Sequence, residues 1–520
     1  MIVGAGSAGC VLAARLSEDP RVSVLLLEAG PEDADERIHV PMGFLELGPE
    51  LDWGYRSAPE DACGQRRIPL PRGRVLGGCS STNAMIYVRG NAHDYDDWGL
   101  AGWSWAEMLP CFLKAEDNQR GRSRWHAVGG PLAVSDPAAL DDASRAFLHA
   151  AEQAGLARNE DLNGASQDGA GVFQLTQRDG MRASAADAYL RPAAARPNLT
   201  VMTDTHVRAV LFDGVRARGV EATRRGETHE LSAAREVIVC AGAYNSPQLL
   251  MLSGIGPAAH LRERGVEVLR DRAAVGDNLS DHAASELLWM TAQPSERDAR
   301  RRWRSAKLML ATGRGAFASG LAQVGAFARV EPAALAPDAQ LHFVAVSFPG
   351  SGAEERDACG AWLSPCLLTP RSRGSVRLAD GDPRAAPVIS NRFYAHEDDL
   401  RRMIAAVRLA LRIARRPAIS RYCAEPFKTP AADTDEAIGE HVAQTTFAFY
   451  HPVGTCRMGA DADAVVDLEL RVNGVQRLRV VDASVMPAVP RGNTNAAAIA
   501  VAERAAELIG RGGAPQAFSS

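Results

Sequence analysis

The chain begins with a pattern that few folds accommodate: a short apolar strand, a glycine-rich turn and a helix. Residues 2–3 are apolar, residues 4–9 read Gly-Ala-Gly-Ser-Ala-Gly, and the next segment has an apolar face at helical spacing. A second apolar run, residues 22–27, ends at Glu28. A strand, a G-x-G-x-x-G turn, a helix and an acid that ends the next strand together predict a βαβ unit that binds a dinucleotide.

Each position of this unit has a physical role. The first glycine makes the tight turn, the second lets the backbone approach a pyrophosphate, and the third allows close helix–strand packing. The helix N-terminus offers free N–H groups to phosphate, and Glu28 can accept hydrogen bonds from ribose hydroxyls. An acid rather than an arginine there favours FAD or NAD over NADP. The expected nucleotide contacts are Gly4, Gly6, Ser7, Ala8, Gly9, Glu28 and Ala29.

Composition limits the remaining possibilities. With 520 residues, 46% of them hydrophobic, the chain is long enough for two or more domains. A net charge of −5 gives no reason to expect nucleic acid as a partner. The nine cysteines form no C-x-x-C pair, which predicts reduced thiols, a cytoplasmic chain and no metal site. We expect no signal peptide, since residue 1 lies within the nucleotide motif, and no membrane-spanning run.

Periodicity predicts the other elements. Alternation over residues 199–241 predicts a β-meander with strands at 200–207, 209–212 and 219–222, followed by a buried strand at 237–240. Residues 72–90 are too apolar for a surface loop, so we expect them to run through the interior. Further expected strands are 341–346, 366–369 and 478–482, and the expected helices are 245–254, 401–412 and 496–508.

Four segments, found in order along the chain, resemble the glucose–methanol–choline (GMC) family of FAD-dependent oxidoreductases. They are RGRVLGGCSSTNAMIYVRG at 72–90, GAYNSPQLLMLSGIG at 242–256, VGDNLSDH at 275–282 and YHPVGTCRMG at 450–459, followed by VDASVMP at 481–487 and GNTN at 492–495. The resemblance covers essentially the whole chain. It is strongest toward the bacterial branch that contains choline dehydrogenases and aliphatic alcohol dehydrogenases.

The resemblance implies an α/β fold, α+β overall, with a Rossmann-type FAD-binding domain and a second domain built on a mostly antiparallel sheet that covers the flavin. The FAD-binding domain would be discontinuous and comprise residues 1–145, 190–289 and 470–510. The substrate-binding domain would comprise residues 146–189 and 290–469, and residues 511–520 would form a disordered tail.

The same resemblance assigns further cofactor contacts. A loop along the pyrophosphate and isoalloxazine, a backbone contact to adenine and a late segment of the chain would complete the FAD site. The residues at these positions are Gly77, Gly78, Asn83, Ala84, Met85, Val207, Asp482, Ala483, Asn493 and Thr494. Some relatives bond FAD covalently through a histidine where this chain has Thr82, so we expect non-covalent FAD.

His451 and Asn493 match the catalytic pair of the family. Neutral imidazole can accept the alcohol proton near neutral pH, and an amide can donate a hydrogen bond to the same oxygen without titrating. Asn495 lies two residues further on and could share the role of Asn493. We interpret His282 as structural, and Cys456 as no nucleophile because nothing adjacent to it would stabilise a thiolate.

The resemblance therefore predicts oxidation of a primary alcohol to the aldehyde, with hydride transfer to flavin N5 and electrons passed to a quinone or an electron-transfer protein. Alternatives are an oxidase that forms hydrogen peroxide from O₂, a light-driven fatty-acid decarboxylase, and a non-catalytic flavoprotein. A quinone acceptor would fit a cytoplasmic enzyme that associates peripherally with the inner membrane face. The sequence carries no code for the alcohol, although the low aromatic content, 6%, argues against an aromatic pocket.

Overall fold

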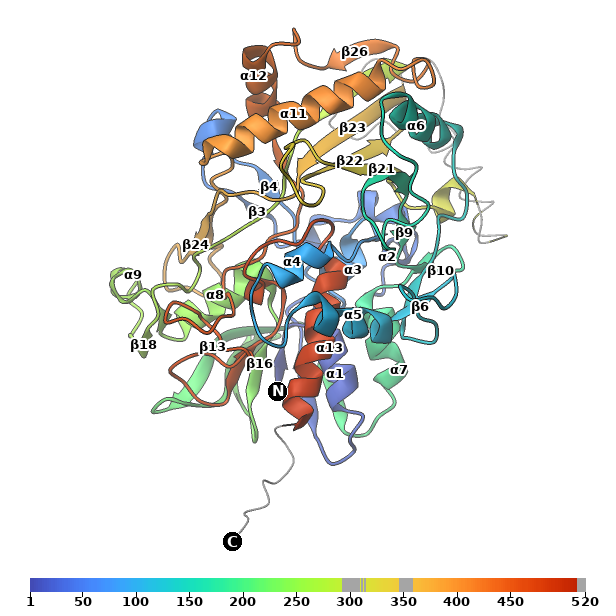
Figure 1. Cartoon of the computed structure of the whole chain (residues 1–520). Coiled ribbons are helices and arrows are strands. Elements are labelled where there is room, and N and C mark those ends of the chain that lie inside the picture. The colour runs from blue at the N-terminus through green and yellow to red at the C-terminus, as the bar shows by residue number, and fades with distance from the viewer. Residues whose placement is uncertain (292–308, 310–311, 313–314, 346–358, 512–520) are drawn as a thin grey trace.

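Five strands from distant parts of the chain form a parallel sheet around the N-terminal strand. The computed structural model describes residues 1–291, 309, 312, 315–345 and 359–511 (Figure 1). The sheet order is β12-β2-β1-β16-β28, and every neighbouring pair is parallel. The strands are β1 (Ile2–Val3), β2 (Val24–Leu27), β12 (Leu199–Met202), β16 (Val237–Val239) and β28 (Leu478–Val480). Their near-continuous Val, Ile and Leu content is typical of parallel strands buried on both faces.

The first and last helices of the described chain pack against each other beside this sheet. Helix α1 (Ser7–Leu16) follows the glycine turn, and α13 (Asn495–Arg511) runs alongside it (Figure 1). The predicted helix at 496–508 is thus confirmed, whereas most of the predicted 511–520 tail lies outside the described residues. Tight packing of the turn explains its glycines, because a Cβ on Gly9 would lie 1.9 Å from the carbonyl oxygen of Gly4.

The predicted meander is divided between two sheets. Its expected first strand breaks at residues 203–204, where Asp204 has a φ of +52°. Asp is among the few non-glycine residues that adopt left-handed geometry readily. Strand β12 therefore joins the parallel sheet, and only β13 (Thr205–Asp213), β14 (Arg216–Arg224) and β15 (Glu227–Ser232) form the antiparallel sheet.

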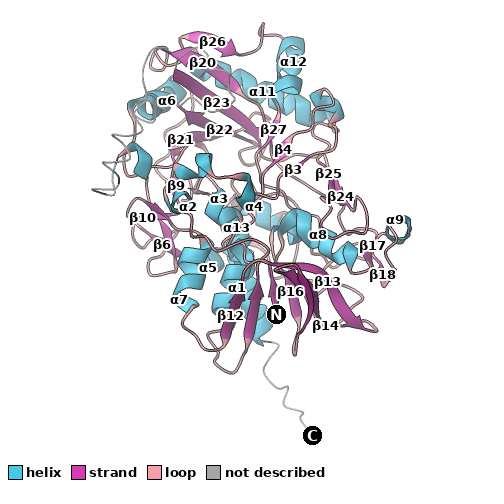
Figure 2. Cartoon of the chain, turned by 180° about the vertical axis from the view of Figure 1, so that it is seen from behind, coloured by secondary structure: helices cyan, strands magenta, loops and turns pink. Residues whose placement is uncertain are grey.

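A large antiparallel sheet lies at the opposite end of the molecule (Figure 2). Its main path runs β26-β20-β23-β22-β21-β8, and β19 and β27 pair beside it. The strands are β8 (Gly169–Val172), β19 (Ala283–Ala284), β20 (Leu287–Thr291), β21 (Val324–Ala328), β22 (Ala339–Val344), β23 (Cys359–Leu367), β26 (Glu425–Lys428) and β27 (Phe447–Ala448). The chain thus enters this sheet a few residues before the domain boundary expected at residue 290.

Two helices cover one face of the antiparallel sheet. Helix α6 (Asp142–Gln153) contacts β21 and β22, and α11 (Glu397–Ala414), which contains the predicted helix 401–412, crosses β23 (Figure 1). Strand alternation assigns each side chain to a face. Leu341 and Phe343 of β22 join the helix-side core, where Phe343 stacks on Phe147 of α6 at 5.1 Å between ring centroids. His342 and Val344 therefore face the other way.

No helix in the described part of the chain combines the length and the apolar character needed to cross a bilayer.

Candidate active site

A cavity of about 1570 Å³ lies between the ends of the parallel strands and the inner face of the antiparallel sheet. It is larger than the roughly 300–1,000 Å³ of a pocket for one drug-sized ligand. Most of the residues that the sequence analysis selected line it: Gly4, Gly6, Ser7, Ala8, Glu28, Ala29, Gly78, Asn83, Ala84, Met85, Val207, His451, Asp482, Ala483, Asn493 and Thr494. Thr82 lines the same cavity.

Gly9 and Gly77 do not line the cavity. Both instead allow close backbone packing beneath the residues that line it. Gly9 allows α1 to approach the Gly4 turn, as described above. The Gly77 N–H donates to the carbonyl of Ala5 at 2.8 Å, which holds the 72–90 segment against the glycine turn. A Cβ on Gly78 would lie 2.8 Å from the Cα of Gly6, so these two backbones are in direct contact.

The nucleotide end of the cavity has the features that a pyrophosphate needs. A Cβ built on Gly6 meets nothing within 4 Å, because this glycine faces the cavity beside the N-terminus of α1. Glu28 is buried, and its carboxylate accepts the N–H groups of Ala5 and Gly30 at 2.8 and 2.9 Å. Each carboxylate oxygen keeps a second lone pair for a ribose hydroxyl. The glycine cradle, the open helix end and the cavity size fit an FAD molecule.

Two polar side chains fix the rest of this wall. Asn83 accepts the N–H of Met85 at 2.9 Å and a guanidinium hydrogen bond from Arg182 at 2.8 Å. Asp482 follows β28 and accepts the Gly242 N–H at 2.9 Å and the Ser246 hydroxyl at 2.5 Å, which anchors the start of α8 (Gly242–Leu252).

His451 and Asn493 meet at the cavity although they lie far apart in sequence. The Asn493 amide nitrogen is 3.1 Å from Nε2 of His451. His451 is buried, and desolvation by burial lowers the pKa of its imidazole well below 6.5. The ring is therefore neutral near pH 7, which is the form that can accept a proton.

A chain of hydrogen bonds determines which nitrogen of His451 is basic. His282 Nε2 is 3.0 Å from the carbonyl oxygen of Leu368, which can only accept, so Nε2 carries the His282 proton. Burial lowers the pKa of His282 to about 3, so its Nδ1 keeps a lone pair. This Nδ1 is 2.9 Å from Nδ1 of His451, which must therefore be the protonated nitrogen. The lone pair of His451 is consequently on Nε2, beside Asn493.

Asp281 holds the same histidine by its backbone. One carboxylate oxygen accepts the His451 N–H at 2.8 Å, while burial raises the pKa of Asp281 to about 7. The adjacent residues 281 and 282 thus fix both the main chain and the ring of His451. Sequence reasoning gave His282 a structural role and missed this contact, because the two histidines are 169 residues apart in the chain.

Asn495 and Cys456 have other surroundings. The side-chain Oδ1 of Asn495 accepts the Ser7 hydroxyl at 2.6 Å and so ties the start of α13 to the start of α1. Cys456 is fully buried, and desolvation raises the pKa of its thiol well above 9.

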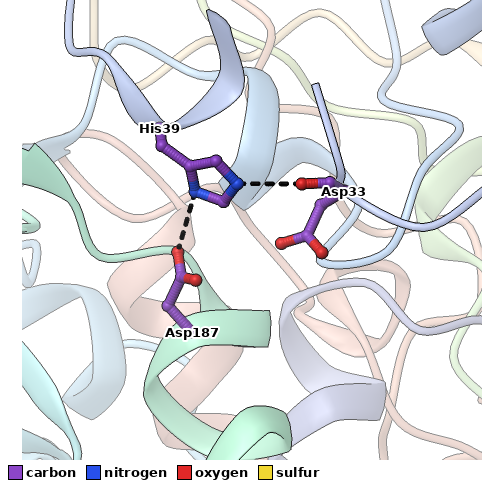
Figure 3. Close-up of side chains that lie close together, drawn as sticks. All are labelled: Asp33, His39 and Asp187. Carbon is purple, nitrogen blue, oxygen red and sulfur yellow. Dashed lines mark hydrogen bonds and ion pairs between the residues drawn. The ribbon is translucent and has the colours of Figure 1, made fainter. Parts of the chain in front are cut away.

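One cluster has the residue types of a metal site but is held together by an arginine. Asp33, His39 and Asp187 lie close together (Figure 3). Arg191 donates to Asp33 at 2.8 Å and to Asp187 at 2.7 Å, and His39 Nε2 is 2.8 Å from the Asp33 carbonyl oxygen. The guanidinium thus pairs with both carboxylates, and we interpret the cluster as an ion-pair network between α2 (Glu36–His39) and η4 (Ala186–Leu190).

Comparison with known proteins defines the class of this chain. Family models for the GMC oxidoreductase N- and C-terminal regions match residues 1–284 and 370–502. The chain therefore belongs to the GMC oxidoreductase family and is an enzyme that acts on CH–OH groups.

Its relatives and structural neighbours match over nearly their full length. An "alcohol dehydrogenase [acceptor]" of Pseudomonas putida is 39% identical, and an "oxygen-dependent choline dehydrogenase" of Rhizobium etli is 40% identical, each over 98% of this chain and 95% of the relative. The solved pyridoxine 4-oxidase from Mesorbium loti has a TM-score of 0.89 and 33% identity, over 98% of both chains. A formate oxidase from Aspergillus oryzae, studied for its FAD modification, has a TM-score of 0.90 and 26% identity over 98% of both chains.

Proposed function

We propose that this protein is an FAD-dependent dehydrogenase that oxidises a primary alcohol to the aldehyde, with His451 as general base and Asn493 as hydrogen-bond donor. The observation that carries the proposal is the 3.1 Å contact between Nε2 of His451 and the Asn493 amide at the cavity wall. Nε2 carries the lone pair, which accepts the Asn493 amide N–H in this structure. An alcohol oxygen that contacts both groups would take the place of this hydrogen bond, accept the amide N–H and present its own proton to Nε2.

His451 and Asn493 have different roles at the alcohol oxygen. His451 Nε2 accepts the hydroxyl proton, and the Asn493 N–H stabilises the negative charge that develops on oxygen as the proton leaves. FAD, when bound, supplies the acceptor for the hydride that leaves the carbon. One proton and one hydride thus leave the alcohol, which becomes the aldehyde.

The FAD would lie along residues 4–9, with the adenosine toward Glu28, Ala29 and Val207 and the flavin toward residues 82–85 and His451. We propose non-covalent attachment, because a threonine hydroxyl at position 82 is no match for a histidine as a nucleophile. Acid precipitation of the purified protein should leave FAD in the supernatant; flavin that stays with the pellet would contradict this.

Anaerobic stopped-flow measurement of flavin reduction tests the catalytic pair. His451→Ala should keep FAD bound but slow reduction by alcohol about 10²-fold or more, as expected for loss of a general base. Asn493→Ala should lower kcat and kcat/KM together, by about 10²-fold, because the donor acts in the transition state. Reduction of the His451→Ala flavin within about threefold of the wild-type rate would reject the assignment.

Asn495→Ala is the matched control for Asn493. Asn495 binds Ser7 rather than His451, so its loss should weaken FAD binding or folding and leave the reduction rate of the bound flavin nearly unchanged. A greater loss of reduction rate in Asn495→Ala than in Asn493→Ala would transfer the donor role to Asn495.

The reduced flavin must pass its electrons to an acceptor. We propose a quinone or another electron-transfer partner, and peripheral contact with the membrane that supplies it. Enzyme reduced anaerobically by alcohol should be reoxidised faster by a soluble ubiquinone analogue than by aerated buffer. Rapid reoxidation by air with stoichiometric hydrogen peroxide, and none by quinone, would show an oxidase instead.

A further inference from the structure

The substrate half of the cavity has an aromatic wall, contrary to what the low aromatic content suggested. Trp362 of β23, Phe447 of β27 and Phe449 all line it. The ring centroids of Trp362 and Phe447 are 5.8 Å apart, and those of Phe447 and Phe449 are 5.7 Å apart. Phe449 is in turn 5.4 Å from His451. These three rings thus form a row that ends at the proposed base.

A second histidine lines this part of the cavity and has no hydrogen-bond partner. His342 of β22 is only 4% exposed, yet neither Nδ1 nor Nε2 has a partner within the described part of the chain. Its ring lies 4.5 Å from Phe449 and 5.2 Å from Phe173, centroid to centroid. Most buried polar groups in proteins are hydrogen-bonded, so the unsatisfied donor and acceptor of His342 at the cavity wall are available to a polar group of a ligand.

The two histidines indicate where the polar groups of such a ligand would bind. Phe449 contacts both His451 and His342, so both histidines lie within about one ring's width of the same aromatic side chain. A flat substrate stacked on this wall would present its hydroxymethyl group to His451 and Asn493. A second polar group elsewhere on its ring would then reach His342.

Charge favours an uncharged second group. Burial lowers the pKa of His342 to about 3, so its imidazole is neutral and offers one donor and one acceptor. Four carboxylates line the cavity in the described residues: Glu28, Asp52, Glu286 and Asp482. Glu28 and Asp482 belong to the nucleotide wall, Asp52 accepts the N–H groups of Gly54 and Arg72, and Glu286 pairs with Lys428 at 3.3 Å.

Aromatic walls also suit quaternary ammonium ligands, so choline is the natural competitor. A trimethylammonium group has neither an N–H nor a lone pair, and would leave both nitrogens of His342 without partners. A phenolic hydroxyl or a ring nitrogen would satisfy one of them.

We propose that the substrate is an aromatic primary alcohol with a second, uncharged hydrogen-bonding group on its ring, and that His342 binds that group. This inference rests on the proposed function, since it names the substrate class of the same site. His342 is accordingly a specificity residue, which acts on the part of the substrate remote from the reacting carbon.

Anaerobic flavin reduction of the holoenzyme by benzyl alcohol, 3- and 4-hydroxybenzyl alcohol, 1-hexanol and choline tests the substrate class. For at least one hydroxybenzyl alcohol, the limiting rate of flavin reduction divided by Kd should be about tenfold higher than for benzyl alcohol. Choline should give the lowest value of the five alcohols. His342→Phe keeps a ring of similar size without nitrogens, and should reduce that tenfold ratio to about one. His149→Phe, at an exposed position on α6, is the control and should keep the wild-type ratio.

Binding of unreactive analogues gives a second measurement that needs no variant. From the perturbation of flavin absorbance, 3- or 4-methylphenol should bind wild-type holoenzyme about tenfold more tightly than toluene. Preference for choline, equal rates for benzyl and hydroxybenzyl alcohols, or equal binding of toluene and the methylphenols would overturn the inference and leave the proposed function intact. If no alcohol reduces the flavin, both proposals fail.

Discussion

At the residue scale, neighbours from distant parts of the sequence determine which nitrogen of His451 is protonated. The Leu368 carbonyl fixes the His282 proton, His282 fixes the His451 proton, and the basic nitrogen is left facing Asn493. Such second partners commonly set histidine tautomers at catalytic sites. His282 is thus a positioning residue: it acts on the alcohol only through His451.

Two substitutions of His282 test this positioning role. His282→Leu removes the acceptor for His451 Nδ1–H, and we expect flavin reduction about 10²-fold slower with FAD still bound. His282→Gln can donate to the Leu368 carbonyl and accept from His451, so it should recover to within about tenfold of the wild-type rate. Equal losses in the two variants, measured by anaerobic stopped flow, would mean that His282 only fills space.

At the element scale, the glycine turn combines two different requirements within six residues. Gly9 has no room for a side chain because of the Gly4 carbonyl, whereas Gly6 faces open space in the cavity. The first is a packing constraint between α1 and β1, and the second is a ligand constraint at the helix N-terminus. The sequence motif contains both but does not distinguish them.

Gly6→Ala should therefore lower the affinity for FAD, whereas Gly9→Ala should lower the stability of the fold. Gly6→Ala has an ordinary backbone and an uncrowded Cβ, so the apoprotein should keep its thermal stability while FAD affinity falls at least tenfold. Gly9→Ala should destabilise the fold by roughly 3 kcal/mol through overpacking. Melting of the apoproteins and FAD titration separate the two effects; similar melting temperatures for both variants would contradict the packing argument.

The ion-pair network of α2 and η4 should make stability depend on pH. The carboxylate of Asp187, with one oxygen 3.8 Å from Nδ1 of His39, raises the pKa of His39 above its ordinary value. A group with a raised folded-state pKa stabilises the fold fully below its unfolded pKa of about 6.5, and this contribution is lost as pH rises through the folded pKa. The contribution of His39 to the free energy of unfolding should thus fall from pH 6 to pH 9.

Comparison with His39→Gln isolates the contribution of this histidine. The wild type should exceed the variant at pH 6 by about 0.5 kcal/mol, a typical value for a partly exposed pair, and the difference should vanish by pH 9. Urea unfolding at both pH values measures it, with His149→Gln as the control. A difference that grows with pH would reverse the sign and reject the network.

At the scale of the whole molecule, one cavity joins the two sheets. Its floor is the glycine turn of the parallel sheet, and its roof includes His342 and Trp362 from the antiparallel sheet. A cofactor that fills it would contact elements from both ends of the chain. FAD should therefore stabilise the molecule as a unit, and not only its nucleotide-binding part.

Thermal melting with added FAD measures this coupling. At a free FAD concentration about 1,000-fold above Kd, the stabilisation should approach about 4 kcal/mol, and the melting temperature should keep rising with FAD concentration. FMN lacks the adenosine half and should stabilise much less at the same concentration. Two separate melting transitions, of which FAD shifts only one, would show that the two sheets are not coupled through the cavity.

Features that depend on local spacing could be predicted from the amino-acid sequence alone. The glycine turn, the acid after β2 and the long helices at 401–412 and 496–508 follow from turn geometry and from apolar periodicity, which neighbouring residues establish among themselves. The motif segments were sufficient to indicate the family, and most of the residues they selected line one cavity.

Features that depend on contacts between distant segments became visible only in the folded chain. Alternation predicts a strand around residue 342, but not that its polar face closes a cavity beside Phe449. Nor does local pattern reveal that residues 199–202 leave the meander for the parallel sheet, or that His282 meets His451. Hydrogen bonds and ring contacts act over a few ångströms in space, and residues more than a hundred positions apart reach that distance only when the chain has folded.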